Sequence, residues 1–179
     1  MKQEPRTILV PLTNGKFTVV DECDAWVMEW KWYASKDPRR GAFYARRNVR
    51  TNGKKSTISL HRVITGAKPG QCVDHVDGNG LNNQRANLRL ATTSQNAINR
   101  GPQRDNTSGF KGVYWYKHDG KWRAQIRVNG KGYVLGCFSD PAEAARAYDI
   151  AAMELHGEFA WLNFPVSGNR GSEVSSNHQ

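Results

Sequence analysis

The sequence is poor in cysteine and contains no long apolar run. Cys23, Cys72 and Cys137 stand far apart without CxxC spacing, which argues against a disulfide framework and against a structural zinc site. We expect each to be a small buried side chain. No stretch approaches the roughly 18 apolar residues of a spanning helix, and no apolar signal-peptide core follows the charged N-terminus. We therefore expect a protein of the cytoplasm with no membrane partner.

Acidic residues are few relative to basic ones. The 179 residues include 26 Lys and Arg but 16 Asp and Glu, a formal net charge of +10. This excess favours a polyanionic partner, because each neutralised phosphate releases condensed counterions. From charge alone, a basic but otherwise ordinary protein remains the alternative. The length suits one ordinary domain or two small ones.

Strand patterns dominate the first hundred residues. Alternating and β-branched residues predict strands at 7–12, 16–20, 42–49 and 55–61, with Asn-Gly turns closing two hairpins. Residues 24–32 form a short amphipathic segment. We expect a small α+β or mostly β unit here.

The second half of the chain changes pattern after residues 101–108, which contain Gly, Pro, Asn and Ser and show no periodicity. Three strand-like runs at 111–116, 121–128 and 132–138 precede a helix at 141–156, for which Asp140 is a suitable N-cap. The predicted organisation is a domain at 1–100, a linker at 101–108, a second domain at 109–165 and a disordered tail at 166–179.

Charge is divided unevenly within the second domain. Residues 109–138 hold six basic residues and one acidic residue, whereas residues 139–164 hold one basic and five acidic residues. Such a module should present its sheet to a polyanion, and alternation along 121–128 leaves one polar face. A solvated position is the alternative for any single residue. We expect DNA contacts from Lys111, Tyr114, Tyr116, Arg123, Gln125, Arg127 and Lys131.

Several short motifs of this segment carry a family resemblance. They are Gly112-Val113, Lys121-Trp122, Ile126-Arg127, Leu135-Gly136, the run AARAYD at 144–149 and the run LNFP at 162–165. The segment resembles the Apetala-two/ethylene-response-factor DNA-binding domain of plant transcription factors. The resemblance implies a three-stranded antiparallel sheet, packed on one helix, that binds duplex DNA. Base preference does not carry over, because Tyr114, Tyr116, Gly132 and Val134 depart from the plant pattern.

Residues 73–96 contain the side chains that phosphodiester hydrolysis requires, namely a base for water and ligands for a divalent cation. Asp74 and His75 end an apolar run, Asn87 follows His75 by twelve residues, and Asn96 lies nine residues further, on a predicted helix. Carboxylate and amide oxygens suit a single Mg²⁺ or Mn²⁺. A surface turn is the alternative for an isolated Asp-His pair.

The motifs of this segment are Asp74-His75, the run DGN at 77–79, the run LNN at 81–83, the run NLR at 87–89 and the run SQN at 94–96. They resemble the HNH nuclease family with its ββα-metal core. The resemblance implies that His75 is the general base, that Asp74 and Asn96 bind the metal, and that Asn87 braces the loop. Asn96 stands where the eponymous motif has histidine.

Three further residues are candidate phosphate ligands. Arg85 and Arg89 can clamp phosphate oxygens. His61 belongs to a Leu60-His61-Arg62 element that resembles one in phage-type HNH nucleases. For His61, a structural hydrogen bond is the alternative.

These residues together predict a metal-dependent HNH endonuclease, similar to homing endonucleases, targeted to double-stranded DNA by its second domain. We expect a monomer without a small-molecule cofactor, encoded by a phage and acting at the nucleoid of a bacterial host. One alternative is a non-catalytic DNA-binding regulator with a worn nuclease remnant. Another is cleavage of structured RNA, although a broad positive sheet fits the DNA major groove better.

Overall fold

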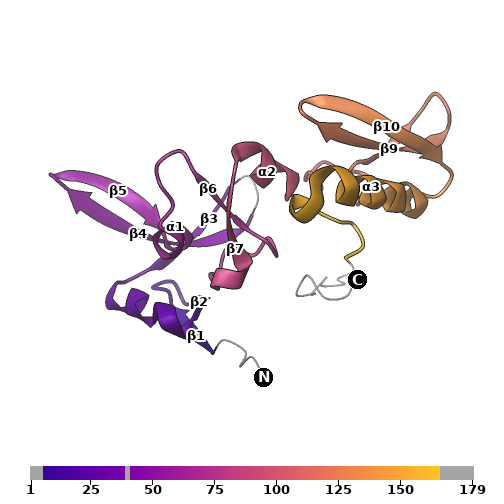
Figure 1. The fold of residues 1–179 in the computed structure, drawn as a ribbon. Helices are drawn as coiled ribbons and strands as arrows, with labels where there is room; N and C mark the ends of the chain where they lie inside the picture. The colour runs from indigo at the N-terminus through magenta and orange to yellow at the C-terminus, as the bar shows by residue number, and fades with distance from the viewer. Residues whose placement is uncertain (1–5, 39–40, 166–179) are drawn as a thin grey trace, which may run out of the picture. The chain divides into compact units, whose positions relative to one another are not determined.

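The computed structural model describes residues 6–38 and 41–165. The chain divides into two compact units, Met1–Thr93 and Ser94–Gln179. Small antiparallel sheets and few helices make up both units and confirm the α+β class (Figure 1). The predicted tail at 166–179 lies outside the described residues, and the predicted domain bounds stay a prediction. Within the described ranges, no helix has the length and apolar character needed to cross a membrane.

The first unit begins with the predicted hairpin. Strands β1 (Thr7–Pro11) and β2 (Phe17–Asp21) pair antiparallel, which confirms the pattern. The amphipathic segment that follows is a 3-10 helix, η1 (Glu22–Glu29). Strand β3 (Tyr33–Lys36) was not predicted, because its four residues carry no clear alternation.

A three-stranded sheet continues the first unit in the order β3-β4-β5, with β4 (Phe43–Thr51) in the centre and β5 (Lys54–Ser59) at the edge. The prediction of a strand to residue 61 was wrong, because helix α1 (Leu60–Thr65) begins at Leu60. Leu60 and Ile64 are both buried, and their spacing of four residues places them on one face of a helix.

The core of the first unit joins these elements. Trp32 and Leu60 are completely buried and pack with Val10, Val20 and Val27. Burying side chains of this size stabilises a fold by roughly 1.5–3 kcal/mol each. This core fixes α1 and β4 in the first unit, on which part of the site described below is built.

A short ribbon carries the motif residues. Strand β6 (Cys72–His75) pairs antiparallel with β7 (Leu88–Ala91), and the 3-10 turn η2 (Arg85–Asn87) lies between them. Helix α2 (Thr93–Ile98) follows directly. The boundary between the two units falls inside α2.

The second unit contains one three-stranded antiparallel sheet in the order β10-β9-β8. Its strands are β8 (Val113–Tyr116), β9 (Lys121–Val128) and β10 (Lys131–Phe138). Helix α3 (Pro141–His156) begins and ends as predicted, and Asp140 Oδ1 accepts a hydrogen bond from the Ala142 amide at 3.0 Å. The turn η3 (Gly157–Phe159) follows α3.

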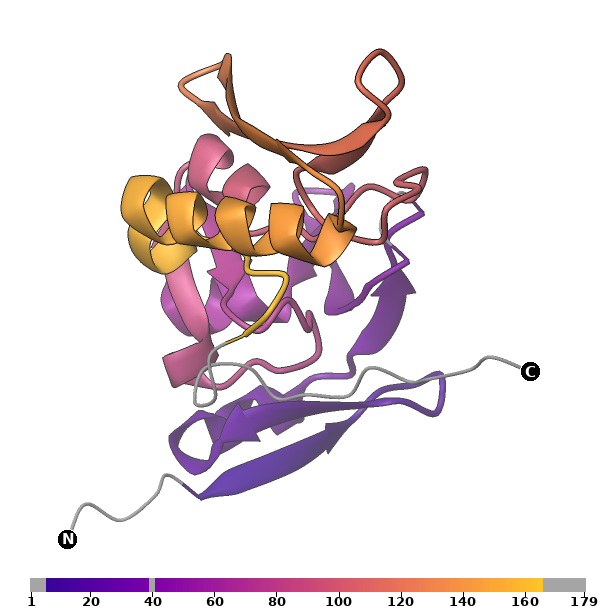
Figure 2. The ribbon, with the colours of Figure 1, turned by 90° about the vertical axis from the view of Figure 1, so that its right-hand side faces the viewer.

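Helix α3 packs against one face of this sheet through small side chains (Figure 2). Ala144 and Ala145 contact Val113 and Ala124, and all four are at most 2% exposed. Gly112 allows α3 to approach the sheet closely, because a Cβ at residue 112 would lie 2.1 Å from the Tyr148 ring. The opposite face of the sheet stays open.

The expected burial of the three cysteines was wrong. Cys23 is exposed, whereas Cys72 and Cys137 are half-buried, and none of them forms a disulfide. Cys137 lies on the open face of the sheet because it pairs with Arg123 in register, and Arg123 Nε donates to its Sγ at 3.5 Å.

Candidate functional site

Asp74 and His75 are buried at the end of β6, only 4% and 5% exposed. Asp74 lies opposite Arg89 in the β6–β7 ribbon, and Arg89 Nε and Nη2 donate to Asp74 Oδ2 at 2.9 and 2.7 Å. A buried carboxylate needs a cationic partner of this kind. The candidate phosphate ligand Arg89 is therefore engaged inside the protein.

Asn87 ties together the loop that follows His75. Its Oδ1 accepts from the Asp77 amide at 2.9 Å, and its Nδ2 donates to Asp77 Oδ1 at 2.9 Å and to the Asn82 carbonyl at 2.8 Å. The Val76 amide also donates to the Asn87 carbonyl, at 2.9 Å. The backbone immediately after His75 is thereby held by several hydrogen bonds.

A buried hydrogen-bond relay reaches His75 from β2. The Thr18 hydroxyl donates to the Leu81 carbonyl at 2.7 Å, so its oxygen accepts from Asn83 Nδ2, also at 2.7 Å. Asn83 Oδ1 then lies 3.3 Å from His75 Nε2. Thr18 and Asn83 are both completely buried. Asn83 belongs to the LNN run of the motif, although the sequence assigned it no role, and Thr18, 65 residues from Asn83, gives no local signal.

This relay fixes the tautomer of the neutral His75 ring. Because the Asn83 amide nitrogen is committed to Thr18, the amide oxygen faces His75 as an acceptor. Nε2 therefore carries the hydrogen and Nδ1 the lone pair. Burial lowers the pKa of His75, although the Asn83 hydrogen bond, Asp77 and Asp74 act in the opposite direction. The ring is consequently neutral at pH 7.

Two aromatic rings surround His75. The ring centroids of His61, from α1, and Tyr44, from β4, lie 5.1 and 5.9 Å from that of His75. Burial lowers the pKa of His61 to about 3, and the neighbouring His75, once it is protonated, acts in the same direction, as do Arg62 and Arg46. His61 Nδ1 is buried without a hydrogen-bond partner among the described residues. The structure thus brings His61 to His75, together with Tyr44, which sequence reasoning missed.

Gly80 explains why Tyr44 can approach this loop so closely. A Cβ at Gly80 would lie 2.5 Å from both the Phe43 carbonyl oxygen and the Tyr44 ring. The second glycine of the DGNG run is therefore required by packing and not by its backbone angles.

Arg85 lies in a separate polar cluster of the first unit. Its Nε and Nη2 donate to the completely buried Asp24 at 2.8 and 2.7 Å, and its amide donates to Asp21 at 2.8 Å. Asp21, Cys23 and Asp24 offer atoms within 4.8 Å of one another. Since Arg85 binds both carboxylates, this cluster has a structural explanation as the anchor of η2.

Asn96 lies on α2 and is half-buried. It belongs to the second unit, since the boundary falls after Thr93. Its proposed role beside Asp74 therefore remains a prediction.

The open face of the β8–β10 sheet carries most of the predicted DNA-binding residues. Tyr114 is opposite Arg123, and Gly132 is opposite Arg127, so these residues share one face. The Arg123 Cζ lies 3.2 Å from the centroid of the Tyr116 ring. A Cβ at Gly132 would lie 2.1 Å from Gln125 Nε2, so the glycine makes room for the Gln125 amide. The side chains Tyr114, Tyr116, Arg123, Gln125 and Arg127 are thus brought together.

The two predicted lysines lie elsewhere in the second unit. Lys111 Nζ donates to the Ile98 carbonyl and lies 5.9 Å from the centroid of the Trp161 ring. Lys131 is exposed at the start of β10, opposite Val128, a position that belongs to the other face by alternation. Neither lysine is therefore grouped with Arg123 and Arg127.

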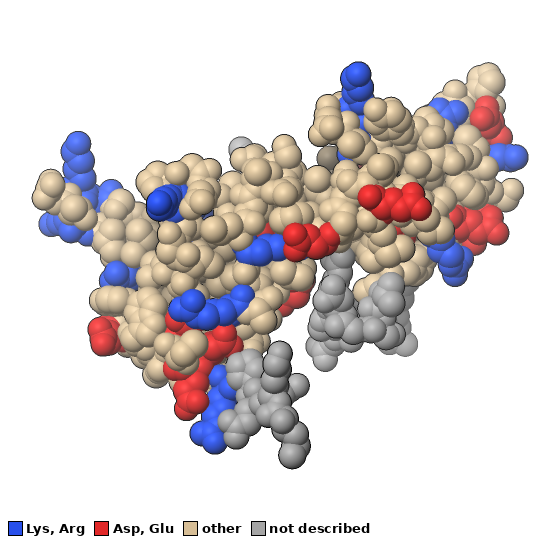
Figure 3. All heavy atoms as spheres, viewed as in Figure 1, with Lys and Arg blue, Asp and Glu red and all other residues tan. Residues whose placement is uncertain are grey.

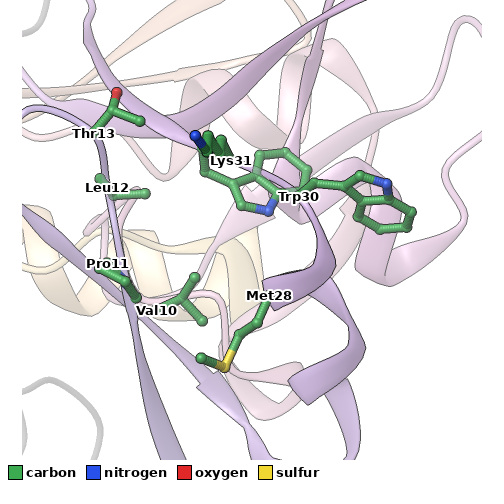
Figure 4. Close-up of a pocket in the computed structure, with 8 residues that line it drawn as sticks. Val10, Pro11, Leu12, Thr13, Met28, Trp30 and Lys31 are labelled. Carbon is green, nitrogen blue, oxygen red and sulfur yellow. The ribbon is translucent and has the colours of Figure 1, made fainter.

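A hollow of about 420 Å³ indents the first unit between β1 and η1 (Figure 4). Its lining is mainly apolar and includes no residue of the His75 cluster: Val10, Pro11, Leu12, Thr13, Met28, Trp30, Lys31 and Trp32.

Comparisons with known proteins match both halves of the chain. Residues 60–98 match the HNH endonuclease family, and residues 108–158 match the AP2 domain. Protein 3.8 of Escherichia phage T7 is 38% identical over 104 residues, which are 58% of this chain and 85% of that protein.

Two further relatives match different shares of the chain. An uncharacterized HNH endonuclease of Acanthamoeba polyphaga mimivirus is 34% identical over 158 residues, 84% of this chain and 76% of that protein. APETALA2-like protein 2 of Oryza sativa subsp. indica is 43% identical over 68 residues, 38% of this chain and 15% of that protein. The chain therefore belongs to the HNH endonuclease family and, as its motifs predicted, joins an HNH segment to an AP2 domain.

Proposed function

We propose that this protein is a metal-dependent endonuclease that hydrolyses phosphodiester bonds in duplex DNA, with His75 as the general base. The observation that carries the proposal is the buried, neutral and oriented His75 ring beside Asp74 within the HNH segment. In this tautomer, Nδ1 is the atom that would accept a proton from water as it attacks phosphorus. The bond to the 3′-oxygen then breaks, leaving 5′-phosphate and 3′-hydroxyl ends.

The donor set fits a hard divalent cation. Asp74 offers a carboxylate that is 4% exposed and already binds a cationic group, and Asn96 offers an amide oxygen. We assign both to a single Mg²⁺ or Mn²⁺, with no structural zinc. When bound, such an ion stabilises the charge that develops on the leaving oxygen. The succession β6, β7, α2 would be the ββα-metal core.

The other residues have supporting roles in this proposal. Asn87 holds the loop after His75 through its bonds to Asp77 and Asn82. Arg85, Arg89 and His61 are proposed to contact phosphate oxygens near the cleaved bond. Since both arginines are ion-paired, a phosphate has to share or replace a carboxylate partner.

The AP2 domain would hold the duplex through its open sheet face, because Arg123, Gln125 and Arg127 can reach base edges or phosphates in a major groove. Tyr114 and Tyr116 flank them, and Lys111 and Lys131 would contact the backbone from outside that face. We propose a monomer that acts on DNA in the cytoplasm of a phage-infected bacterial cell.

The second candidate function is a DNA-binding regulator without catalysis. The Asp74–Arg89 ion pair favours it, because it occupies the carboxylate oxygen Oδ2. Both candidates predict DNA binding, and only the first predicts cleavage.

Incubation of supercoiled plasmid with Mg²⁺, Mn²⁺ or EDTA separates the two candidates. We expect metal-dependent conversion to nicked or linear plasmid by the wild type. His75→Ala should lose it, whereas His118→Ala, on an exposed turn, should retain it. Genomic DNA is the second substrate, in case the plasmid lacks the target site. If both DNAs are bound and neither is cut, the regulator is the correct reading.

A further inference from the structure

We propose that the β4–β5 ribbon is a second DNA-binding surface, which lies on duplex DNA immediately beside the cleaved bond. This inference rests on the proposed function in one respect, namely that duplex DNA is the partner. The surface consists of Arg46 and Arg50 on β4 with Lys55 on β5.

The first observation is unpaired charge. Residues 41–59 contain five basic residues and no acidic residue. None of the five forms an ion pair with any residue that the structure describes. Lys and Arg side chains accordingly gather at the free end of the ribbon in the space-filling view (Figure 3). A surface of one sign without counterions fits a polyanion.

The second observation is the register of the ribbon. Arg50 lies directly opposite Lys55, whereas Lys54 is opposite Thr51 and belongs to the other face. Like charges in directly opposed positions destabilise an antiparallel pair. Basic residues on an edge strand can prevent edge-to-edge aggregation, which would account for the lysines of β5. It does not account for Arg46, which lies where β4 is flanked by both β3 and β5, whereas Arg50 lies where β4 pairs with β5 alone.

Arg47, on the same strand, has a structural role. It belongs to the other face of β4, and its Cζ lies 4.2 Å from the centroid of the Trp30 ring. Arg46 has one long hydrogen bond, from Nη1 to Ser35 Oγ at 3.5 Å, and its Cζ lies 5.8 Å from the centroid of the Tyr44 ring, a longer distance than that between Arg47 and Trp30. The buried Nε atoms of both arginines have no partner among the described residues. Arg50 is exposed.

The face of β4 that carries Arg46 and Arg50 extends away from His75. Alternate residues of a strand share a face, so Tyr44, Arg46, Asn48 and Arg50 form one row. The row begins at Tyr44, whose ring centroid is 5.9 Å from that of His75. From there to Arg50 the strand extends about 20 Å, or roughly six base pairs. Contacts should therefore cover about six base pairs on one side of the cut.

The test is the salt dependence of binding to a random-sequence, fluorescein-labelled DNA duplex, measured by anisotropy with the full chain in EDTA. The variant is Arg50→Gln/Lys55→Gln, and the matched control is Lys31→Gln/Lys68→Gln, two exposed lysines of the same unit. Loss of two phosphate contacts should reduce the slope of log K against log salt by about 1.8. The unfolding temperature of the variant should rise, because a like-charge pair is removed. The control should keep the wild-type slope.

A variant slope equal to that of the control would overturn the proposal. So would an unchanged DNA slope combined with weaker binding to phosphatidylserine vesicles, which would identify a membrane surface as the partner. Because the assay contains EDTA, its result does not depend on cleavage. A protein that binds through the ribbon and never cuts DNA would refute the nuclease and leave this surface intact.

Discussion

Two buried side chains, Thr18 and Asn83, decide which nitrogen of His75 carries a hydrogen. Thr18 lies on β2 and receives the Asn83 amide because its own hydroxyl donates to Leu81. Asn83 in turn presents its oxygen to His75 Nε2. A base held in the wrong tautomer loses most of its catalytic effect even when its position is unchanged.

Replacement of Asn83 by leucine should therefore reduce the cleavage rate without weakening DNA binding. We expect a loss on the order of 10²–10⁴-fold, since the ring is free to take the other tautomer. Nitrogen NMR shifts of the His75 ring measure the tautomer directly. Thr18→Ser keeps the hydroxyl and is the control. A wild-type rate in Asn83→Leu would show that Asn83 has no positioning role.

His61 should make the stability of the first unit depend on pH. Its pKa is lowered to about 3 in the folded protein, mainly by burial, whereas the unfolded chain has the ordinary value near 6.5. The unfolded state consequently takes up the proton first, so stability is complete above about pH 6.5 and falls progressively as the pH drops toward 3.

Urea unfolding of wild type and His61→Gln at several pH values tests this dependence. The free energy of unfolding of the wild type should fall more steeply below pH 6.5 than that of the variant. The difference should reach at most about 5 kcal/mol. Parallel curves would mean that His61 takes up its proton in the folded protein as readily as in water.

At the scale of elements, the β6–β7 ribbon matters because it pairs Asp74 with Arg89. The Arg89 and Asp74 side chains are 14% and 5% exposed, so the ion pair is largely buried. Removing one partner from a buried pair leaves an uncompensated charge and typically costs about 3–5 kcal/mol.

Arg89→Met should lower stability by about that amount, and Mg²⁺ or Mn²⁺ should restore part of it. The reason is that a bound cation would compensate the Asp74 carboxylate in place of the guanidinium. Thermal unfolding with and without metal measures the effect. The double variant Asp74→Asn/Arg89→Met should show no metal dependence. Equal stabilisation of both proteins would argue against Asp74 as a metal ligand.

Local signals explain which elements could be predicted. Helix α3 was predicted from Asp140 and Pro141 at its start and Gly157 at its end, which act within a few residues. Helix α1 was mistaken for strand, because the burial of Leu60 and Ile64 depends on tertiary packing.

The same distinction applies to the candidate site. Asp74, His75, Asn87 and Asn96 carry a motif, so the sequence names them. The motif spans only part of the cluster, however. Thr18 and Tyr44 reach it from β2 and β4, far along the chain, and no local pattern marks them. The partner of Arg85, Asp24, is likewise 61 residues away.

At the scale of the whole molecule, the proposed function assigns DNA cleavage to the HNH segment and DNA binding to the AP2 domain. The HNH segment belongs chiefly to the first unit, and the AP2 match lies within the second. Binding and cleavage should thus be separable by mutation, because the residues proposed for each lie on different segments.

Arg127→Ala should weaken duplex binding and leave the intrinsic cleavage rate of bound DNA unchanged. If Arg127 contacts a phosphate, the salt slope should fall by about 0.9; if it contacts a guanine, the loss should be about 1–3 kcal/mol and specific to sequence. Arg146→Ala, on α3 and away from the open face, is the control. Equal effects of both variants would contradict DNA binding by this sheet face.

The most direct test of the central claim is whether DNA ligase reseals the nick that the protein makes in supercoiled plasmid. Water activated by His75 and attacking phosphorus leaves 5′-phosphate and 3′-hydroxyl ends, which ligase joins without prior end repair. The account predicts metal-dependent nicks that are resealed, with none formed by His75→Ala. Nicks that His75→Ala still makes, or ends that ligase cannot join, would contradict it.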